Sequence, residues 1–294
     1  MTAQRALVIG ASGFTGSRVL RQAPEGWTVY GMVRSAAAAT AVSNAEGTPV
    51  EGDLDQPESV AAALQSVKPA IVIVTASLGF GHAPSLVETL ESYGPDRVVF
   101  TSTTGIFTKL NPASKAVRLA AEETIEESNL SWITLRPTMI YGRPGDRNME
   151  RLLRYLARVP VLPAPNGGNN LQQPVHVDDL ADALWSAGVS THLASQAVNV
   201  PGPDALHFRE IVEGAAHAVG RRGQVVPVPV GPVRQIMRLR ERVDIGPNIK
   251  VEQIDRLVED KAFDVQPASE LLDHRPRSFV AGIEDEAALL GLVA

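Results

Sequence analysis

Three glycines, Gly10, Gly13 and Gly16, follow a short apolar run at residues 6–9 with the spacing GxxGxxG. At a turn from a strand into a helix, this spacing lets backbone N–H groups approach a diphosphate, and the helix N-terminus favours the negative charge. Gly10 permits the tight turn, Gly13 the close approach of the phosphates, and Gly16 the packing of the helix on the sheet. The pattern predicts a dinucleotide site; the alternative is a tight structural turn. The other residues expected to line this loop are Ser12, Phe14 and Thr15.

Arg34 lies where dinucleotide-binding domains select their cofactor, roughly 20 residues after the glycine loop. A domain that prefers NAD presents an Asp or Glu there to the adenosine ribose, whereas residues 32–35 read Met-Val-Arg-Ser and contain no carboxylate. An arginine pairs well with a 2′-phosphate. The sequence therefore predicts NADP(H) as the cofactor. The alternative is that Arg34 is a solvated surface residue and the site is unselective.

Short apolar runs alternate with helical patterns through the first half of the chain, which is typical of β-α-β units around a parallel sheet. Strands are expected at residues 6–9, 28–33, 49–51, 70–75, 97–102 and 132–135. Helices are expected between them at residues 15–22, 36–42, 57–66, 85–93 and 114–128. These elements predict the α/β class, with a doubly wound parallel sheet of the Rossmann type.

Proline and glycine become frequent after residue 143 and indicate a more loop-rich region. A short strand is expected at residues 173–177, and helices at 148–158, 178–188, 208–219, 232–243 and 251–258. We assign residues 1–143 to a dinucleotide-binding domain, which is completed by about residues 173–200. Residues 144–172 and 201–294 are expected to form a smaller C-terminal substrate lobe over the carboxyl edge of the sheet, where ligands of open α/β folds bind.

The composition excludes several classes of function. The formal net charge of −6 argues against a nucleic-acid partner, which needs a clustered excess of Lys and Arg. The chain has no cysteine, so it has no disulfides and no thiolate ligands, and we expect no metal site. No segment reaches the ~18 apolar residues of a membrane helix, and no signal-peptide core precedes the glycine loop. We expect a soluble, cytoplasmic protein without a membrane partner. A homodimer stays open as its assembly.

Four further motifs follow the glycine loop in order. They are Gly-Asp-Leu-Asp at 52–55, Phe-Thr-Ser-Thr at 100–103, Leu-Arg-Pro-Thr-Met-Ile-Tyr-Gly at 135–142, and Val-His-Val-Asp-Asp-Leu at 175–180. Together the five motifs resemble the extended short-chain dehydrogenase/reductases, and more narrowly the atypical members of the NAD(P)-dependent epimerase/dehydratase-like family. The resemblance covers about residues 5–220.

This resemblance implies which strand ends would contact the cofactor. Asp53 would accept from the adenine amino group, and Leu54 would pack on the adenine ring. The other positions that the resemblance places against the cofactor are Thr75, Ala76, Ser77, Pro137, Thr138 and Met139. For Asp53 and Asp55 the alternative is a turn and helix N-cap that lead into Pro57.

The resemblance also implies a Tyr-x-x-x-Lys pair, in which the tyrosine donates or accepts the proton. Lys115 is present, but Asn111 stands at the tyrosine position. An amide exchanges no proton near neutral pH, although it can still polarise a carbonyl group. Lys115 is expected to hold the nicotinamide ribose; the alternative is an ordinary surface lysine.

Three substitutes for the missing acid stay open. Lys115 could deliver a proton if its pKa were lowered, or a hydroxyl of Thr103, Thr104 or Tyr141 could act with an ordered water. The third option is chemistry that needs no side-chain acid. Ser102 is a further catalytic candidate, with a strand-end hydroxyl bonded to backbone as its alternative.

Arg147, Gln173 and His176 are the candidates for substrate contacts, although a histidine in such a position is more often a packing residue. The residues favour an NADPH-dependent oxidoreductase that transfers hydride to a carbonyl or activated double bond of a small molecule. A sugar-nucleotide epimerase or dehydratase is a second possibility within catalysis, and the missing tyrosine counts against it. A redox-silent protein that binds or senses NADP(H) is the alternative from another class.

Overall fold

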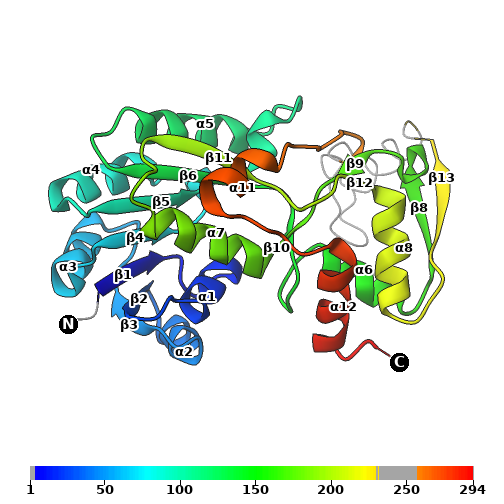
Figure 1. Ribbon diagram of the computed structural model, residues 1–294, viewed down its shortest axis with the longest axis horizontal. Helices are drawn as coiled ribbons and strands as arrows, with labels where there is room; N and C mark the ends of the chain where they lie inside the picture. The colour runs from blue at the N-terminus through cyan, green and yellow to red at the C-terminus, as the bar shows by residue number, and fades with distance from the viewer. Residues whose placement is uncertain (1–3, 230, 232–256, 294) are drawn as a thin grey trace, which may run out of the picture.

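The computed structural model describes residues 4–229, 231 and 257–293, and contains one seven-stranded parallel sheet. The strand order is β11-β6-β5-β4-β1-β2-β3, so the chain starts in the interior of the sheet and builds outward in both directions (Figure 1). The strands are β1 (Gln4–Ile9), β2 (Trp27–Val33), β3 (Thr48–Glu51), β4 (Ile71–Val74), β5 (Arg97–Thr101), β6 (Trp132–Pro137) and β11 (Gln196–Val200). All of their pairings are parallel, as predicted for the Rossmann type.

Helices cover both faces of this sheet because neighbouring side chains of a strand point to opposite sides. Ala6 and Val8 face one core, and Leu7 and Ile9 face the other. The first core contains residues of α1 (Phe14–Arg21), α2 (Ala36–Asn44) and α7 (Val177–Val189). The second contains residues of α3 (Pro57–Val67), α4 (Ala83–Tyr93) and α5 (Ala113–Glu126). The predicted doubly wound arrangement is thereby confirmed.

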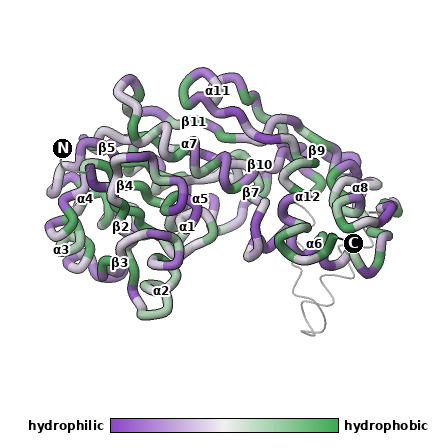
Figure 2. Tube along the Cα trace, turned by 60° about the horizontal axis from the view of Figure 1, so that its bottom comes forward, coloured by the Kyte–Doolittle hydropathy of each residue, from purple (hydrophilic) through white to green (hydrophobic). Residues whose placement is uncertain are grey.

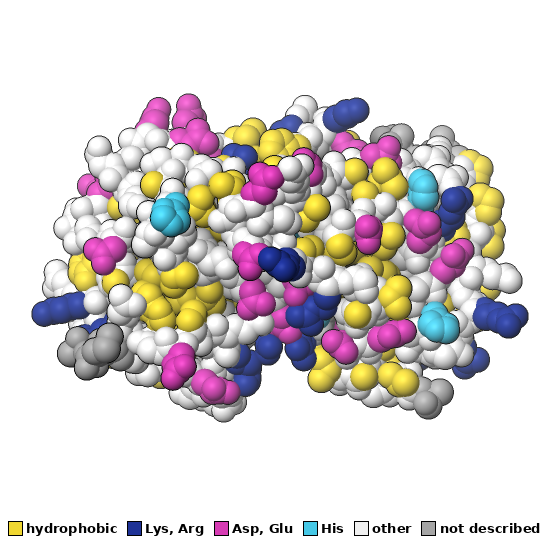
Figure 3. All heavy atoms as spheres, in the orientation of Figure 1, with side chains coloured by type: hydrophobic (Ala, Val, Ile, Leu, Met, Phe, Trp, Pro, Cys, Tyr) yellow, Lys and Arg dark blue, Asp and Glu magenta, His cyan; other side chains and the backbone are white. Residues whose placement is uncertain are grey.

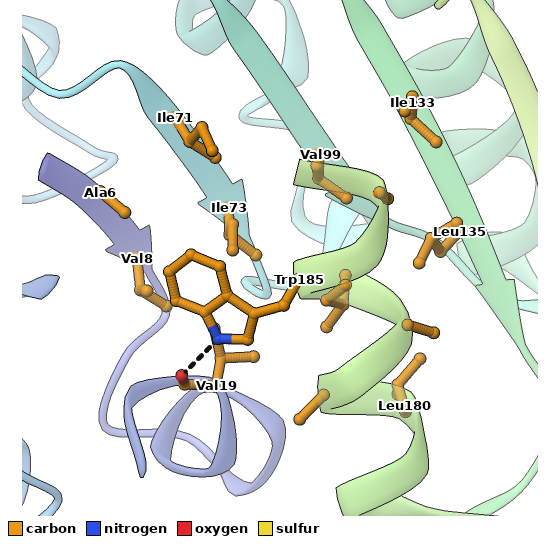
Figure 4. Close-up of a cluster of buried hydrophobic side chains, with 14 of the residues drawn as sticks. Ala6, Val8, Val19, Ile71, Ile73, Val99, Ile133, Leu135, Leu180 and Trp185 are labelled. Carbon is orange, nitrogen blue, oxygen red and sulfur yellow. Dashed lines mark hydrogen bonds between the residues drawn. The ribbon is translucent and has the colours of Figure 1, made fainter. Parts of the chain in front are cut away.

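Trp185 of α7 anchors the first core between the sheet and α1. Its ring packs beside Val8 and Ile73, and its Nε1–H donates to the carbonyl oxygen of Val19 at 2.8 Å (Figure 4). A buried indole needs such an acceptor for its N–H group. The contact fixes the helix that follows the glycine loop relative to the sheet.

A smaller lobe lies at one end of the molecule, away from α3 and α4 (Figures 1 and 2). Its elements are β7 (Ile140–Tyr141), α6 (Met149–Leu156), β8 (Val161–Pro165), β9 (Leu171–Gln172), β10 (Val175–His176), β12 (Leu206–His207), α8 (Phe208–Ala218), β13 (Gln224–Val228) and α12 (Phe279–Leu289). The three two-stranded pairs are β7-β10, β9-β12 and β8-β13. Buried side chains of α6, α8 and α12 form a third core there.

The six expected strands all lie in the sheet, and β11 adds a seventh. The strand expected at 173–177 is reduced to β10, and the following helix begins at Val177 rather than at 178. The helix α11 (Gln266–Leu272) packs into the first core through Ala268 and Leu272, so this part of the expected substrate lobe belongs to the large domain. The helix expected at 232–243, and most of the one at 251–258, lie outside the described residues.

Among the helices in the described part of the chain, none combines the length and the hydropathy needed to cross a membrane.

Candidate functional site

The glycine loop joins β1 to α1, and its backbone leaves no room for a side chain at Gly10 or Gly16. Gly10 has φ +89°, and a Cβ atom on it would lie 2.6 Å from the backbone nitrogen of Ala76. A Cβ on Gly16 would lie 2.2 Å from the carbonyl oxygen of Gly10. Gly13 donates its N–H to that same oxygen at 3.0 Å. Gly10 and Gly16 are thus required by the close packing of the loop, whereas the role of Gly13 toward a diphosphate stays a prediction.

The N-terminus of α1 has the properties of an anion site. Gly13 is its N-cap and offers no side-chain acceptor, and the first turn contains no acidic residue. The first N–H groups of a helix have no acceptor within the helix, so those of Phe14 and Thr15 remain available to a ligand. The arrangement fits the diphosphate of a dinucleotide.

Residues at the end of β4 hydrogen-bond to the backbone at the start of the glycine loop. The N–H groups of Thr75 and Ala76 donate to the carbonyl oxygen of Ile9 at 2.8 and 3.1 Å. The Thr75 hydroxyl lies 3.1 Å from that oxygen and 3.2 Å from the carbonyl oxygen of Gly10. Ser77 follows as the N-cap of a short 3-10 helix, Leu78–Phe80, and accepts from the N–H of Gly79.

The residues expected at the adenosine end lie at the ends of β2 and β3. Arg34 is exposed directly after β2, and no ion pair to it is found among the described residues. Asp53 is half-buried, and its carboxylate accepts from the N–H of Asp55 at 3.1 Å within a turn. Leu54 packs partly against the second core. Gln56, not Asp55, is the N-cap of α3, so the N-cap interpretation is wrong while the turn is present.

Ser102 belongs to a buried polar cluster at the end of β5. Its hydroxyl donates to the carboxylate of Glu122, which Arg136 of β6 binds through Nε and Nη2. Glu122 is only 4% exposed, and Arg136 compensates its charge. The guanidinium of Arg136 also lies 5.5 Å from the ring centroid of Phe107. The Ser102 hydroxyl thus bonds to a side chain rather than to the backbone.

Asn111 and Lys115 do not form a pair separated by one helical turn. Pro112 is the N-cap of α5, so Asn111 lies before the helix and is exposed. Lys115 is half-buried, and its ammonium donates to the carbonyl oxygen of Thr108 at 2.6 Å. Lys115 is thus held in a defined position, whereas no hydrogen bond to the Asn111 side chain is found within the part of the chain that the structure describes.

The hydroxyls of Thr103 and Thr104 bond to neighbouring backbone. Thr103 caps a 3-10 helix, Thr104–Phe107, by accepting from the N–H of Gly105 at 3.0 Å, and Thr104 donates to the carbonyl oxygen of Pro137 at 3.2 Å. Thr138 follows β6, is 8% exposed, and its hydroxyl has no partner among the described residues. Pro137 and Met139 flank it at the carboxyl edge of the sheet.

Tyr141 and His176 lie together inside the smaller lobe. The Tyr141 hydroxyl is 3.4 Å from the carbonyl oxygen of Phe279, and burial raises the pKa of this tyrosine. His176 is the N-cap of α7: its Nδ1 accepts from the N–H of Asp178, and its Nε2 lies 3.2 Å from the carbonyl oxygen of Gly142. Burial lowers the pKa of His176. Both side chains are 1% exposed, so we assign them structural roles.

A group of opposite charges connects the large domain with the smaller lobe. Asp178 accepts from Arg18 of α1 on one oxygen and from Arg143 of the lobe on the other, and Arg277 pairs with Asp179 at 2.7 Å. Burial acts to raise the pKa of Asp178, but the hydrogen bond from Arg143 and the charge of Arg18 outweigh it, so this pKa is lowered. Acidic and basic side chains also gather beside the notch between the two lobes (Figure 3).

Two of the expected substrate residues differ in their surroundings. Gln173 is buried, donates to the carbonyl oxygen of Gly202 at 2.8 Å and accepts from the N–H of Phe263 at 2.7 Å. Arg147 is exposed and stands before α6. Glu122 and Glu259, which bond to the residues around Ser102 and Lys115, were not among the predicted site residues.

Comparisons with known proteins identify the first half of the chain. Residues 10–155 match a protein-family model described as NAD(P)H-binding. A ceramide reductase from Caulobacter vibrioides is 26% identical over 235 residues, which are 76% of this chain and 73% of that protein. An uncharacterized protein from Mycobacterium tuberculosis is 29% identical over 157 residues, which are 53% of this chain and only 16% of that protein.

The fold resembles a solved epimerase along its whole length. The crystal structure of UDP-glucuronic acid 4-epimerase from Bacillus cereus, in complex with UDP-glucuronic acid and NAD, superimposes with a TM-score of 0.74 at 14% identity. The match covers 98% of this chain and 99% of the epimerase. The glycine loop, the seven-stranded parallel sheet and the match over residues 10–155 together indicate an NAD(P)-binding domain of the Rossmann type, and the chain is similar to the extended short-chain dehydrogenase/reductase-like proteins that its sequence motifs resemble.

Proposed function

We propose that this protein is an NADPH-dependent oxidoreductase that transfers hydride to a carbonyl or activated double bond of a small molecule. The observation that carries the proposal is the glycine loop, where an uncapped helix N-terminus without acidic residues lies at the carboxyl edge of a parallel sheet. The name of one relative, ceramide reductase, supports reduction as chemistry on a related chain.

The residues present fit an NADP(H) molecule. The glycine loop would hold its diphosphate, Arg34 its 2′-phosphate, and Asp53 and Leu54 its adenine. Lys115 would contact the nicotinamide ribose, and Pro137, Thr138 and Met139 would lie against the nicotinamide. When bound, the cofactor supplies the hydride. The chain would supply position, and the hydroxyl of Thr138, which has no partner within the described ranges, is a hydrogen-bonding group at this edge.

Cofactor titrations with Arg34→Ala test the choice of NADPH. We expect the wild type to bind NADPH more tightly than NADH. Loss of charge-assisted bonds to the 2′-phosphate should weaken NADPH binding by roughly tenfold or more, with NADH affinity nearly unchanged. Arg275→Ala removes an arginine whose side chain is 83% exposed and serves as the matched control. Equal losses for both cofactors in Arg34→Ala would remove the NADP(H) assignment.

A redox-silent binding or sensor protein is the second candidate. It is favoured by the region around Lys115, where Asn111 replaces the expected tyrosine and the hydroxyls of Thr103 and Thr104 are bonded to backbone. Tyr141 is enclosed in the lobe. Following NADPH absorbance with a panel of ketones, enones and nucleotide sugars separates the two. Turnover of any ketone or enone supports the oxidoreductase, whereas tight NADPH binding without turnover across the panel supports the silent protein.

An isomerase or dehydratase acting on a sugar nucleotide remains a third candidate, because the epimerase fold is shared along the whole chain. It would convert a nucleotide sugar with no net change in NADPH absorbance. Product analysis of the same panel by mass spectrometry and NMR would detect it.

A further inference from the structure

Residues 258–263, which we call the strap, run from the smaller lobe to the loop beside Lys115. On the lobe side, the N–H of Leu171 donates to Asp260 Oδ1 at 2.9 Å, and the N–H of Lys261 donates to the carbonyl oxygen of Leu171 at 2.9 Å. Gln172 Nε2 donates to the carbonyl oxygen of Glu259 at 3.1 Å. The strap is thus fixed along β9 by side-chain and backbone bonds.

The Glu259 side chain extends from the strap and accepts hydrogen bonds from the large domain. One carboxylate oxygen accepts from the N–H of Lys109 at 2.8 Å, and the other accepts from the hydroxyl of Thr108. The Thr108 hydroxyl also accepts from the N–H of Leu110 at 3.2 Å. Both groups of Thr108 that can accept a bond are therefore used, since its carbonyl oxygen accepts from Lys115 Nζ at 2.6 Å.

An aromatic contact reinforces the same connection. The ring centroid of Phe263 lies 5.9 Å from that of Phe107, the residue that precedes Thr108. The N–H of Phe263 donates to Gln173 Oε1. Phe107 is 51% exposed and has Arg136 on its ring. The loop at residues 107–109 is thus held by the strap at three successive positions.

We propose that Glu259 is a positioning residue for Lys115, and that the smaller lobe sets the place of the lysine ammonium through it. A lysine ammonium is carried on a flexible four-carbon chain, so it stays in one position only if the group that accepts its hydrogen bond also stays fixed. The acceptor is the Thr108 carbonyl, and Glu259 binds the two groups on either side of that carbonyl, the Thr108 hydroxyl and the Lys109 N–H. The role for Lys115 toward a nicotinamide ribose rests on the proposed function; its positioning by Glu259 does not.

The test compares Glu259→Ala with Asp260→Ala. Both variants remove a carboxylate of the strap, but only Glu259 contacts the loop beside Lys115. In protein labelled with ¹³C-lysine, the Lys115 resonance is assigned through Lys115→Arg and compared among the variants. NADPH affinity is measured in the same samples, together with urea unfolding to compare stability.

We expect Glu259→Ala to move the Lys115 resonance toward those of exposed lysines and to weaken NADPH binding about fivefold, while Asp260→Ala leaves both nearly unchanged. Thr108→Val should act like Glu259→Ala, the double variant should add little, and Thr108→Ser should retain the wild-type resonance because it keeps the hydroxyl.

An unchanged Lys115 resonance in Glu259→Ala would overturn the proposal, as would an equal shift in Asp260→Ala. If the wild type bound no nicotinamide dinucleotide, the proposed function would fail, and the resonance would still decide the role of Glu259.

Discussion

Arg18, in the helix after the glycine loop, donates through Nε to Oδ1 of Asp178 at the start of α7, at a distance of 2.5 Å. Asp178 is 3% exposed and accepts from Arg143 of the smaller lobe on its other oxygen. One buried carboxylate therefore connects the helix expected to carry the cofactor diphosphate with the lobe expected to carry the substrate.

Asp178→Asn should destabilise the protein by about 3 kcal/mol, because it leaves two partly buried guanidinium groups without their counter-charge. The free energy of unfolding in urea measures this. Asp273→Asn is the matched control: it alters an ion pair whose side chains are 83% and 77% exposed, and should cost at most about 0.5 kcal/mol. Similar losses in the two variants would mean that Asp178 contributes no more than a surface pair.

Gly13→Ala separates the cofactor site from the fold. Gly13 has φ −77° and ψ 173°, which alanine also adopts, and the nearest atom to an added Cβ is the carbonyl oxygen of Gly10 at 3.1 Å. We expect the free energy of unfolding to change by less than about 1 kcal/mol. NADPH affinity should fall at least about tenfold, because the methyl group would occupy the approach of the diphosphate. Full NADPH affinity in Gly13→Ala would place the diphosphate elsewhere.

The stability of the protein should depend on the ionisation of Glu286. This residue of α12 is 0% exposed; one oxygen accepts from the N–H of Gly142 at 2.9 Å, and the other has no partner among the described residues. Burial, with the charge of Asp146 nearby, raises the pKa of Glu286 from 4.5 to about 8, and burial raises that of Asp146 to about 6. Glu150 adds a further negative charge near both.

Because the folded protein holds this proton more tightly than the unfolded chain, its contribution to stability is complete below pH 4.5 and is lost as the pH rises to about 8. The loss should approach about 1.4 kcal/mol per pH unit within this window. Glu286→Gln keeps an acceptor for Gly142 and should remove the Glu286 part of the dependence. Urea unfolding of both proteins at several pH values measures the difference, and parallel curves would contradict the prediction.

Asn111→Tyr should not restore a conventional proton donor. Asn111 precedes the N-cap Pro112 and is exposed, so a tyrosine there would not lie one helical turn from Lys115. Turnover on any compound of the carbonyl panel should stay within about threefold of the wild type, since an acid acts only within hydrogen-bond reach of the reacting group. A tenfold gain would show that the loop at residues 108–112 can rearrange.

Local patterns were sufficient to predict most of the sheet. Runs such as Ile71–Val74 are apolar throughout because the strand is buried on both faces, and turn residues mark their ends. Strand β11 was not predicted, because Gln196 and Asn199 interrupt its apolar residues. Its place beside β6 depends on the pairing of residues that are far apart in the sequence.

In the candidate site, too, features that depend on neighbouring residues could be predicted, and features that depend on tertiary packing could not. The geometry of the glycine loop follows from neighbouring residues, so its spacing was informative. The partners of Ser102 and Lys115, by contrast, are set by tertiary packing, and Glu259 is 150 residues from Lys109. Tyr141, Gln173 and His176 have side chains capable of chemistry, but only the structure shows that they are enclosed. Residue type indicated a possible role for these side chains, whereas their burial depends on tertiary packing and could not be predicted from residue type.

Because α11 packs into the first core, the large domain cannot be completed in the order in which its strands are synthesised. All seven strands of the sheet have been made once the ribosome has passed Val200, yet Ala268 and Leu272 are still to come, and both are buried in the first core. A nascent chain at that stage would expose an apolar surface on β11 and α7 that the later helix covers. Completion of the large domain must therefore wait until the chain has passed through α6, α8 and β13 of the smaller lobe and returned to make α11.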